Sequence, residues 1–269
     1  MKVITTFYRI ISFIKRYIYA VCHCLYTFTF GIFFTKSRLR LYDICHIFKS
    51  PSEKGQEEAI LQKIKISEVV SENITVEFRG GVPKNGNASA LEIVVINKLV
   101  KQFGPLNVFE IGTFDGLTTL NIAANSREDV RIYTLDLPRS KLDSVRLTLD
   151  KYDKQYIEKD VSGVCFLETS FESKITQLYG DSATFDFSPY NTMDFVFVDA
   201  SHAYEYVLND SQIAIKLLRN KRGIILWHDY GTPYWPGVTK ALNKLYLNNS
   251  EFSCIKHIDE TCFAILVVK

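Results

Sequence analysis

The sequence of 269 residues has few cysteines, six in all, and almost no excess of charge of one sign, with a formal net charge of +2. Six cysteines in a chain of this length do not make the framework of a small disulfide-stapled protein, which favours the reducing cytoplasm as its compartment. The small net charge excludes a globally basic surface for binding nucleic acid. The sequence also lacks internal repeats and low-complexity tracts, which excludes solenoid and disordered classes.

The composition that remains is that of an ordinary globular protein, with 47% hydrophobic and 23% charged residues. The length suits one large domain with an appendage. We therefore predict three regions: an apolar basic segment over residues 1–50, a linker leading into a helix over residues 51–77, and the main domain over residues 78–269.

The first 50 residues carry a net charge of +7, and the rest of the chain carries −5. Within them, Tyr17–Thr35 has no charged residue, and as a helix it would be about 28 Å long, close to the thickness of a bilayer's hydrocarbon core. We predict an apolar helix that contacts a membrane through residues 17–35. The alternatives are a docking or dimerisation helix and an export signal; no small-residue cleavage site follows to favour the signal.

Short apolar runs alternate with amphipathic stretches in the main domain, an order that predicts an α/β fold with a parallel sheet covered by helices on both faces. The predicted strands are Val108–Ile111, Arg131–Leu135, Thr176–Tyr179, Asp194–Val198 and Gly223–Trp227. The predicted helices are Thr118–Asn125, Lys141–Asp150, Tyr204–Leu218 and Val238–Leu247, after a first helix that begins with the capping box at Ser89. Two last strands, Phe252–Ile258 and Cys262–Val268, form an antiparallel hairpin.

The turn after the first strand predicts a ligand site. Gly112 and Gly116 lie between a buried strand and a helix, where glycine lets the backbone turn sharply and lets a ligand approach. Phe114 stands at the middle position of a G-x-G-x-x-G pattern and breaks this pyrophosphate-binding motif. Glu110, at the end of the strand, suits a cationic ligand better than a pyrophosphate. The alternative is a tight turn without a ligand.

Acids at the ends of the next two strands extend this site. Asp136 stands where a carboxylate can accept both hydroxyls of a ribose, which fits a nucleoside but does not choose between nucleoside cofactors. Asp181 and Ser182 follow the third strand, where an adenine usually lies. The alternative for this pair is a simple Asp-Ser turn.

The last two parallel strands end in Asp199, with His202 three residues on, and in His228-Asp229. If the two strands are neighbours, these four residues converge. Carboxylates with an imidazole or water can hold Mg²⁺, and a nearby histidine can remove a proton at working pH. We predict Asp199, His228 and Asp229 as metal ligands and His202 as the general base; the alternative is that His228 only shapes the site.

Five strings in this order resemble the class I S-adenosylmethionine (SAM)-dependent methyltransferases: VFEIGTFDGLTT, IYTLDLP, YGDSATFDF, FVFVDASHAYEYVLNDS and GIILWHDY. The branch that they most resemble includes macrolide-sugar O-methyltransferases and relatives of cephalosporin hydroxylase. The resemblance implies a Rossmann-like sheet of seven strands, mostly parallel, with an antiparallel last strand. The cofactor-binding residues that it implies are Glu110, Gly112, Thr113, Phe114, Gly116, Asp136, Asp181, Ser182 and Asp199.

The family's metal-dependent members use an Asp-x-x-His pair as metal ligand and general base, matched here by Asp199 and His202. Another acidic pair ends their following strand, but here His228 takes the place of one carboxylate. The expected activity is methyl transfer from SAM to a hydroxyl oxygen of a small molecule or sugar, assisted by Mg²⁺ if the metal binds. The alternatives are a nicotinamide-dependent oxidoreductase and a non-catalytic membrane-associated protein.

Acceptor specificity is expected in the loop Phe185–Thr192, in residues 230–236 and in the amino-terminal segment. The acceptor itself, a metal requirement and a homo-oligomeric state stay open at this level.

Overall fold

The computed structural model describes residues 2–34, 41 and 57–268, and the chain divides into two units, Met1–Lys54 and Gly55–Lys269. The first unit contains the predicted apolar helix as α1 (Lys2–Thr29), followed by the 3-10 turn η1 (Gly31–Phe33). No helix in the described part of the chain is both long and apolar enough to cross a membrane.

The second unit is built on one mixed sheet whose strand order, among the described residues, is β1-β7-β8-β6-β5-β2-β3-β4. The strands are β1 (Lys63–Ile64), β2 (Asn107–Ile111), β3 (Arg131–Asp136), β4 (Ile175–Tyr179), β5 (Phe195–Val198), β6 (Gly223–Trp227), β7 (Lys256–Ile258) and β8 (Ala264–Val268). Of the strands in the described residues, β8 alone runs antiparallel to its neighbours, β6 and β7. The mostly parallel sheet with an antiparallel last strand is thus confirmed, with one short strand, β1, beyond the seven expected.

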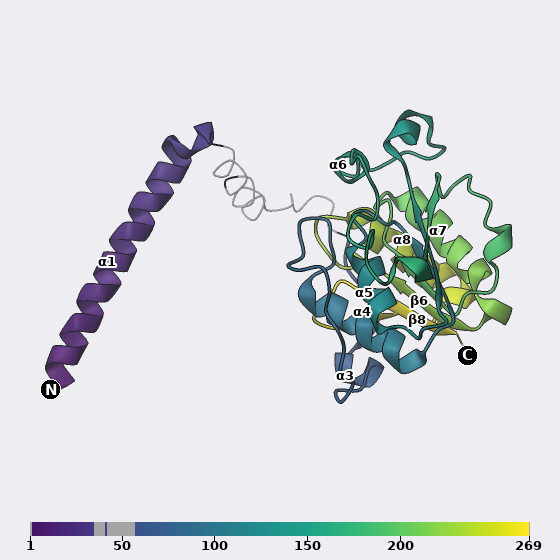
Figure 1. Ribbon diagram of the computed structural model, residues 1–269, viewed down its shortest axis with the longest axis horizontal. Helices are drawn as coiled ribbons and strands as arrows, with labels where there is room; N and C mark the ends of the chain where they lie inside the picture. The colour runs from purple at the N-terminus through teal and green to yellow at the C-terminus, as the bar shows by residue number, and fades with distance from the viewer. Residues whose placement is uncertain (1, 35–40, 42–56, 269) are drawn as a thin grey trace. The chain divides into compact units, whose positions relative to one another are not determined.

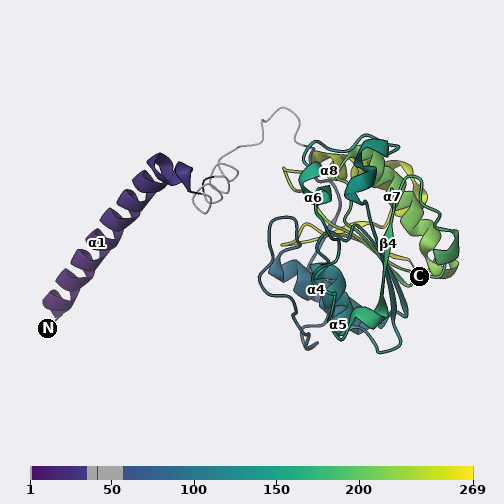
Figure 2. The same cartoon turned by 45° about the horizontal axis from the view of Figure 1, so that its top comes forward.

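Helices cover both faces of the sheet, as the alternation of elements predicts. Figure 2 shows α4 (Ala90–Phe103) and α5 (Leu117–Asn125) on one face, and α7 (Tyr204–Leu217) and α8 (Pro236–Asn248) on the other. Alternate residues of each strand face the two layers, so that Val108 packs with α4 and α5 while Phe109 packs with α7 and α8. The short helices α3 (Ile66–Val69) and α6 (Lys154–Ile157) lie outside these layers (Figure 1).

The sequence signals at the ends of α4 are both present. Ser89 accepts a hydrogen bond from the backbone N–H of Glu92, whose carboxylate accepts one in return from the Ser89 N–H. Gly104 ends the helix in the left-handed conformation, at φ 57°.

The predicted helix over Lys141–Asp150 is wrong. The chain forms the 3-10 helix η2 (Arg139–Ser144) and then an irregular stretch. The Arg146 backbone N–H donates to the carboxylate of Asp181 at 2.8 Å, so the hydrogen bond that would continue a helix is directed to another part of the fold. The strand predicted over Phe252–Ile258 is also shorter: Phe252 ends the 3-10 helix η6 (Ser250–Phe252), a turn follows, and the strand begins at Lys256.

The aromatic residues of the loop Phe185–Thr192 pack against the sheet. The ring of Phe187 lies 5.5 Å from that of Phe109, and Tyr190 lies 4.9 Å from Tyr133 in an edge-on contact. These side chains fill the layer on the α7 side. These rings are therefore partly buried against the core of the protein.

Asp210 of α7 predicts a pH dependence of stability. It is 1% exposed, and burial raises its pKa to about 7 against opposing hydrogen bonds from Ser182 and Asn209. The folded protein then holds a proton that the unfolded chain has lost, so the free energy of unfolding falls as pH rises from about 4 through 7. Asp210→Asn should flatten this slope and stabilise the protein at pH 8 by a few kcal/mol, about 4 at most.

Urea unfolding at pH 5 and pH 8 measures this difference, with the exposed Asp143→Asn as the matched control. An unchanged slope in Asp210→Asn would show that Asp210 is ionised in the folded protein.

Candidate functional site

The turn between β2 and α5 can be formed only with glycine at two positions. Gly112 has φ 105°, and a Cβ there would collide with the backbone carbonyl of Asp199 at the end of β5. Gly116 has φ 81° and caps the N-terminus of α5; a Cβ there would lie 2.8 Å from the Cα of Gly163. Phe114, between them, also has a positive φ, 51°. The turn is therefore a tightly constrained backbone loop at the carboxyl edge of the sheet.

Glu110 lies beneath this turn and is 1% exposed. The hydroxyls of Thr119 and Thr134 donate to its carboxylate, the second at 2.5 Å, and Thr113 lies 2.7 Å from the Thr134 hydroxyl. Burial raises the pKa of Glu110 to about 8, although the two threonine hydrogen bonds oppose this. In the structure, Glu110 thus ties β2 to β3 and α5.

The predicted nucleoside-binding acids stand at the ends of β3 and β4, but their oxygens already have partners. Asp136 forms an ion pair with Lys159 at 2.6 Å and accepts a hydrogen bond from Ser162. Asp181 accepts from the Arg146 backbone N–H at 2.8 Å and from the Tyr206 hydroxyl at 2.9 Å.

One segment makes most of these contacts, and we call residues 146–166 the cover segment. Besides the contacts to Asp136 and Asp181, its Gly163 N–H donates to the carbonyl of Phe114 at 3.0 Å and its Cys165 N–H to that of Asp115 at 2.9 Å. The residue types and their placement at adjacent strand ends fit a nucleoside. A nucleoside bound there has to replace the contacts that the cover segment makes with Asp136.

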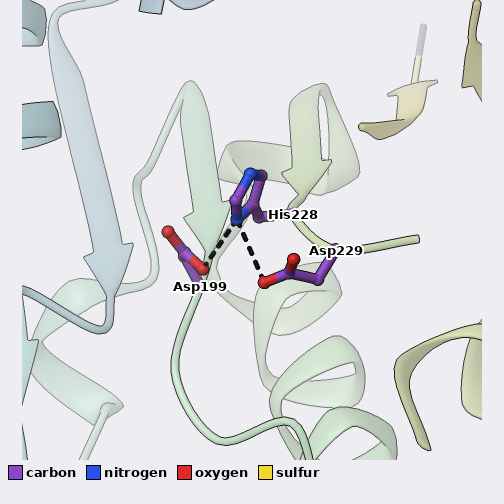
Figure 3. A group of neighbouring side chains, drawn as sticks. All are labelled: Asp199, His228 and Asp229. Carbon is purple, nitrogen blue, oxygen red and sulfur yellow. Dashed lines mark hydrogen bonds and ion pairs between the residues drawn. The ribbon is translucent and has the colours of Figure 1, made fainter. Parts of the chain in front are cut away.

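At the ends of β5 and β6, the predicted convergence of Asp199, His202, His228 and Asp229 is present. Figure 3 shows the carboxylates of Asp199 and Asp229 pointing at the same ring nitrogen of His228. This nitrogen is Nδ1, which lies 3.2 Å from Oδ1 of Asp199 and 3.1 Å from Oδ2 of Asp229. One ligand atom from each of these three residues lies within 4.8 Å of the others, a spacing that allows one metal ion. Two carboxylates and an imidazole fit a divalent cation in their chemistry. Asp229 has the left-handed φ of 63°, a strain typical of functional turns.

A carboxylate that the sequence motifs did not reveal, Glu92 of α4, completes this cluster. Its Oε2 lies 3.3 Å from Nε2 of His228, and its Oε1 accepts from the Cys262 backbone N–H at 2.8 Å. Burial would raise the pKa of Glu92, but the contacts with His228 and the backbone hydrogen bonds lower it to about 2. Burial by itself would lower the pKa of His228. The negative charges of Asp229 and Asp199 outweigh this effect, so that the pKa of His228 lies well above its usual value.

His202 is held from three sides. Its Nδ1 lies 2.6 Å from Oδ1 of Asp153, its Nε2 lies 2.9 Å from Oδ2 of Asp229, and its ring stacks on Trp235 at 3.7 Å. Burial alone would lower the pKa of His202, but the hydrogen bonds and charges of the two aspartates raise it to about 10. The imidazole is therefore charged at neutral pH in this structure.

Four residues of the site were missed by sequence reasoning: Glu92, Asp153, Lys159 and Trp235. Glu92 belongs to the capping box predicted at Ser89, which gave no sign of a role in the site, and Asp153 and Lys159 lie in a stretch without a motif. The aromatic run at 230–236 gave a signal for Trp235, since acceptor contacts were expected there.

Residues 109–230 match the family described as "Methyltransferase domain". A search of curated protein sequences gave no match. Among solved structures, an O-methyltransferase from Bacillus cereus in complex with SAH is 17% identical, with a TM-score of 0.48 over 69% of this chain and 84% of that one. The O-methyltransferase TomG from Streptomyces achromogenes, in complex with SAM and involved in tomaymycin synthesis, is 18% identical, with a TM-score of 0.46 over 68% and 82%. The SAH-bound methyltransferase PaMTH1 from Podospora anserina is 19% identical, with a TM-score of 0.46 over 69% and 81%.

Proposed function

We propose that the chain, whose residues 109–230 match a methyltransferase domain, is a class I methyltransferase that transfers a methyl group from SAM to a hydroxyl oxygen of a small molecule or sugar. The observation that carries the proposal is that the family match covers the same part of the chain as the predicted site residues. The family match, 109–230, begins one residue before Glu110 and ends one residue after Asp229, and so spans every predicted cofactor, metal and catalytic residue.

The loop from Gly112 to Gly116 would hold the amino-acid part of SAM, Asp136 the ribose, and Asp181 with Ser182 the adenine. SAM supplies a methyl group on a positively charged sulfonium, which the carboxylates along this edge of the sheet attract. The chain's own contribution is to align the acceptor hydroxyl with that methyl group, since alignment gives much of the rate gain in such transfers.

His202 would remove the proton of the acceptor hydroxyl. Its Nε2 faces Asp229, at the cluster of Asp199, His228 and Asp229 that would hold a divalent cation such as Mg²⁺. A cation there would polarise the hydroxyl and would offset the Asp229 charge that raises the pKa of His202.

Calorimetric titration with SAM and with NADH separates this proposal from a nicotinamide-dependent oxidoreductase. Heat with SAM alone is expected, because Phe114 interrupts the dinucleotide pattern. Labelled SAM is then incubated with a panel of sugars, phenols, polyketides and lipid alcohols, with and without Mg²⁺. Heat with NADH and none with SAM would overturn the proposal, and SAM binding without any methyl acceptor would favour the non-catalytic alternative.

Lys159→Ala should bind SAM more tightly. The Lys159 ammonium forms a 2.6 Å ion pair with Asp136, both side chains being largely buried at 15% and 9% exposure. A ribose bound at Asp136 has to displace that ammonium, and its removal should lower the Kd for SAM about 10-fold, equivalent to ~1.4 kcal/mol. Calorimetry measures the change, with the exposed Lys154→Ala from the same segment as the control. Weaker binding by Lys159→Ala would mean that Lys159 contacts the cofactor itself.

A further inference from the structure

Asp153 is a buried carboxylate that faces His202 and does not belong to either of the two strand ends. Its side chain is 4% exposed, and it lies just before α6 in the cover segment. Its Oδ1 lies 2.6 Å from Nδ1 of His202, and its Oδ2 accepts from the Ser201 hydroxyl at 2.6 Å and from the His202 backbone N–H at 3.2 Å. One carboxylate thus holds the side chain of His202 and the turn that bears it.

We propose that Asp153 is a positioning residue, which fixes the ring of His202 so that its Nε2 is the nitrogen that meets the acceptor hydroxyl. The inference rests on the proposed function, in which His202 removes the acceptor proton.

Two contacts act on different motions of the ring. A carboxylate on Nδ1 keeps a proton on that nitrogen and so leaves Nε2 to exchange the other one. The indole of Trp235 lies flat on the imidazole, 3.7 Å away with an interplanar angle of 16°, and restricts its tilt. A 180° flip about the Cβ–Cγ bond would keep the ring against the indole but exchange its nitrogens, and the contact of Asp153 with Nδ1 opposes that flip.

The position of Asp153 in the cover segment links His202 to the predicted ribose position. Six residues further on, Lys159 of the same segment pairs with Asp136 at the predicted ribose position. The orientation of His202 therefore depends on where the cover segment lies, and the cover segment contacts the cofactor side of the site. The imidazole of His202 is therefore placed to remove a proton only while Asp153 is in contact with it.

A purely structural role of Asp153 would be to hold the cover segment against the turn after β5. Ser201→Ala is the matched control, because it removes a bond to the same carboxylate and leaves the contact between Asp153 and His202. Asp153→Asn keeps the shape of the side chain but removes its charge, and Asp153→Glu restores the charge. Urea unfolding of all three variants checks that each one is folded.

Proton NMR gives a readout that needs no substrate. The buried ring N–H between His202 and Asp153 should give a far-downfield resonance in the wild type and in Ser201→Ala. It should disappear in Asp153→Asn and in His202→Gln. A resonance that survives in Asp153→Asn would overturn the contact and the proposal with it.

The kinetic test uses the acceptor found with labelled SAM. Asp153→Asn should lower kcat up to about 10²-fold with little change in the KM for SAM, because the donor site is intact and only the base is misplaced. Asp153→Glu should recover part of that loss, and Ser201→Ala should stay near the wild type. Loss of the resonance with unchanged kcat would overturn the positioning role and leave the proposed function standing. Failure to find any methyl acceptor for the wild type in the screen with labelled SAM would overturn both.

Discussion

His202→Ala is expected to leave the affinity for SAM nearly unchanged and to lower the rate of methyl transfer about 10²–10⁴-fold, the usual contribution of a general base. The donor would be held by residues at the ends of β2, β3 and β4, none of which contacts the His202 ring in the hydrogen bonds described above. Single-turnover transfer of labelled methyl groups measures the loss, and calorimetry measures SAM binding.

Two further variants make this result interpretable. His202→Gln keeps a polar side chain between Asp153 and Asp229, so that two carboxylates are not left facing each other in a buried site. His23→Ala, on the exposed surface of α1, is the matched histidine control. Turnover that stays at the wild-type level in both His202 variants would remove this residue from the mechanism.

His202 also sets how the rate of methyl transfer should depend on pH. A base acts only after it has lost its own proton, and Asp153 and Asp229 raise the pKa of His202 to about 10. Without a divalent cation, the rate should therefore rise with pH from neutrality up to about 10, and this rise should be absent from His202→Gln. A cation at Asp229 should shift the rise to lower pH, because it offsets one of the two charges.

Gly112→Ala is expected to have the largest effect on the fold. A Cβ at this position would meet the carbonyl of Asp199, a backbone atom between two packed strands that has little room to move. The left-handed backbone costs an alanine about 1–2 kcal/mol, and relief of the collision should cost about 1–3 kcal/mol more. We expect a loss of about 2–5 kcal/mol in the free energy of unfolding, together with loss of SAM binding.

Gly81→Ala is the matched control for this variant. Gly81 also has a positive φ, 80°, but a Cβ there would meet nothing within 4 Å. Urea unfolding of both proteins separates the backbone cost from the collision. Equal losses in the two variants would show that the close approach to Asp199 contributes nothing to stability.

The sheet and its acidic edge could be predicted because both depend on local patterns. A buried strand such as Phe195–Val198 is a continuous apolar run, and the polar residue that ends it marks the carboxyl edge of the sheet. Since parallel neighbours end at the same edge, the convergence of Asp199 with Asp229 follows from the order of the elements.

The cover segment could not be predicted, because its contacts join residues far apart in the chain. The stretch after Lys141 carries amphipathic residues that favour a helix, yet its conformation is decided by bonds such as that from Arg146 to Asp181, 35 residues away. Asp153 is 49 residues from His202, and Glu92 is 136 residues from His228. Such pairings depend on the tertiary fold, which propensity and periodicity do not describe.

The flat contact between Trp235 and His202 gives the protein an internal optical reporter. Only one other tryptophan is present, Trp227, which is 1% exposed and donates a hydrogen bond to Ser211 in the interior. A charged imidazole against an indole face quenches its emission, so changes in fluorescence would come mainly from Trp235. Movement of the indole away from the imidazole, or loss of the imidazole proton, should brighten the protein, and Trp235→Phe should abolish that signal.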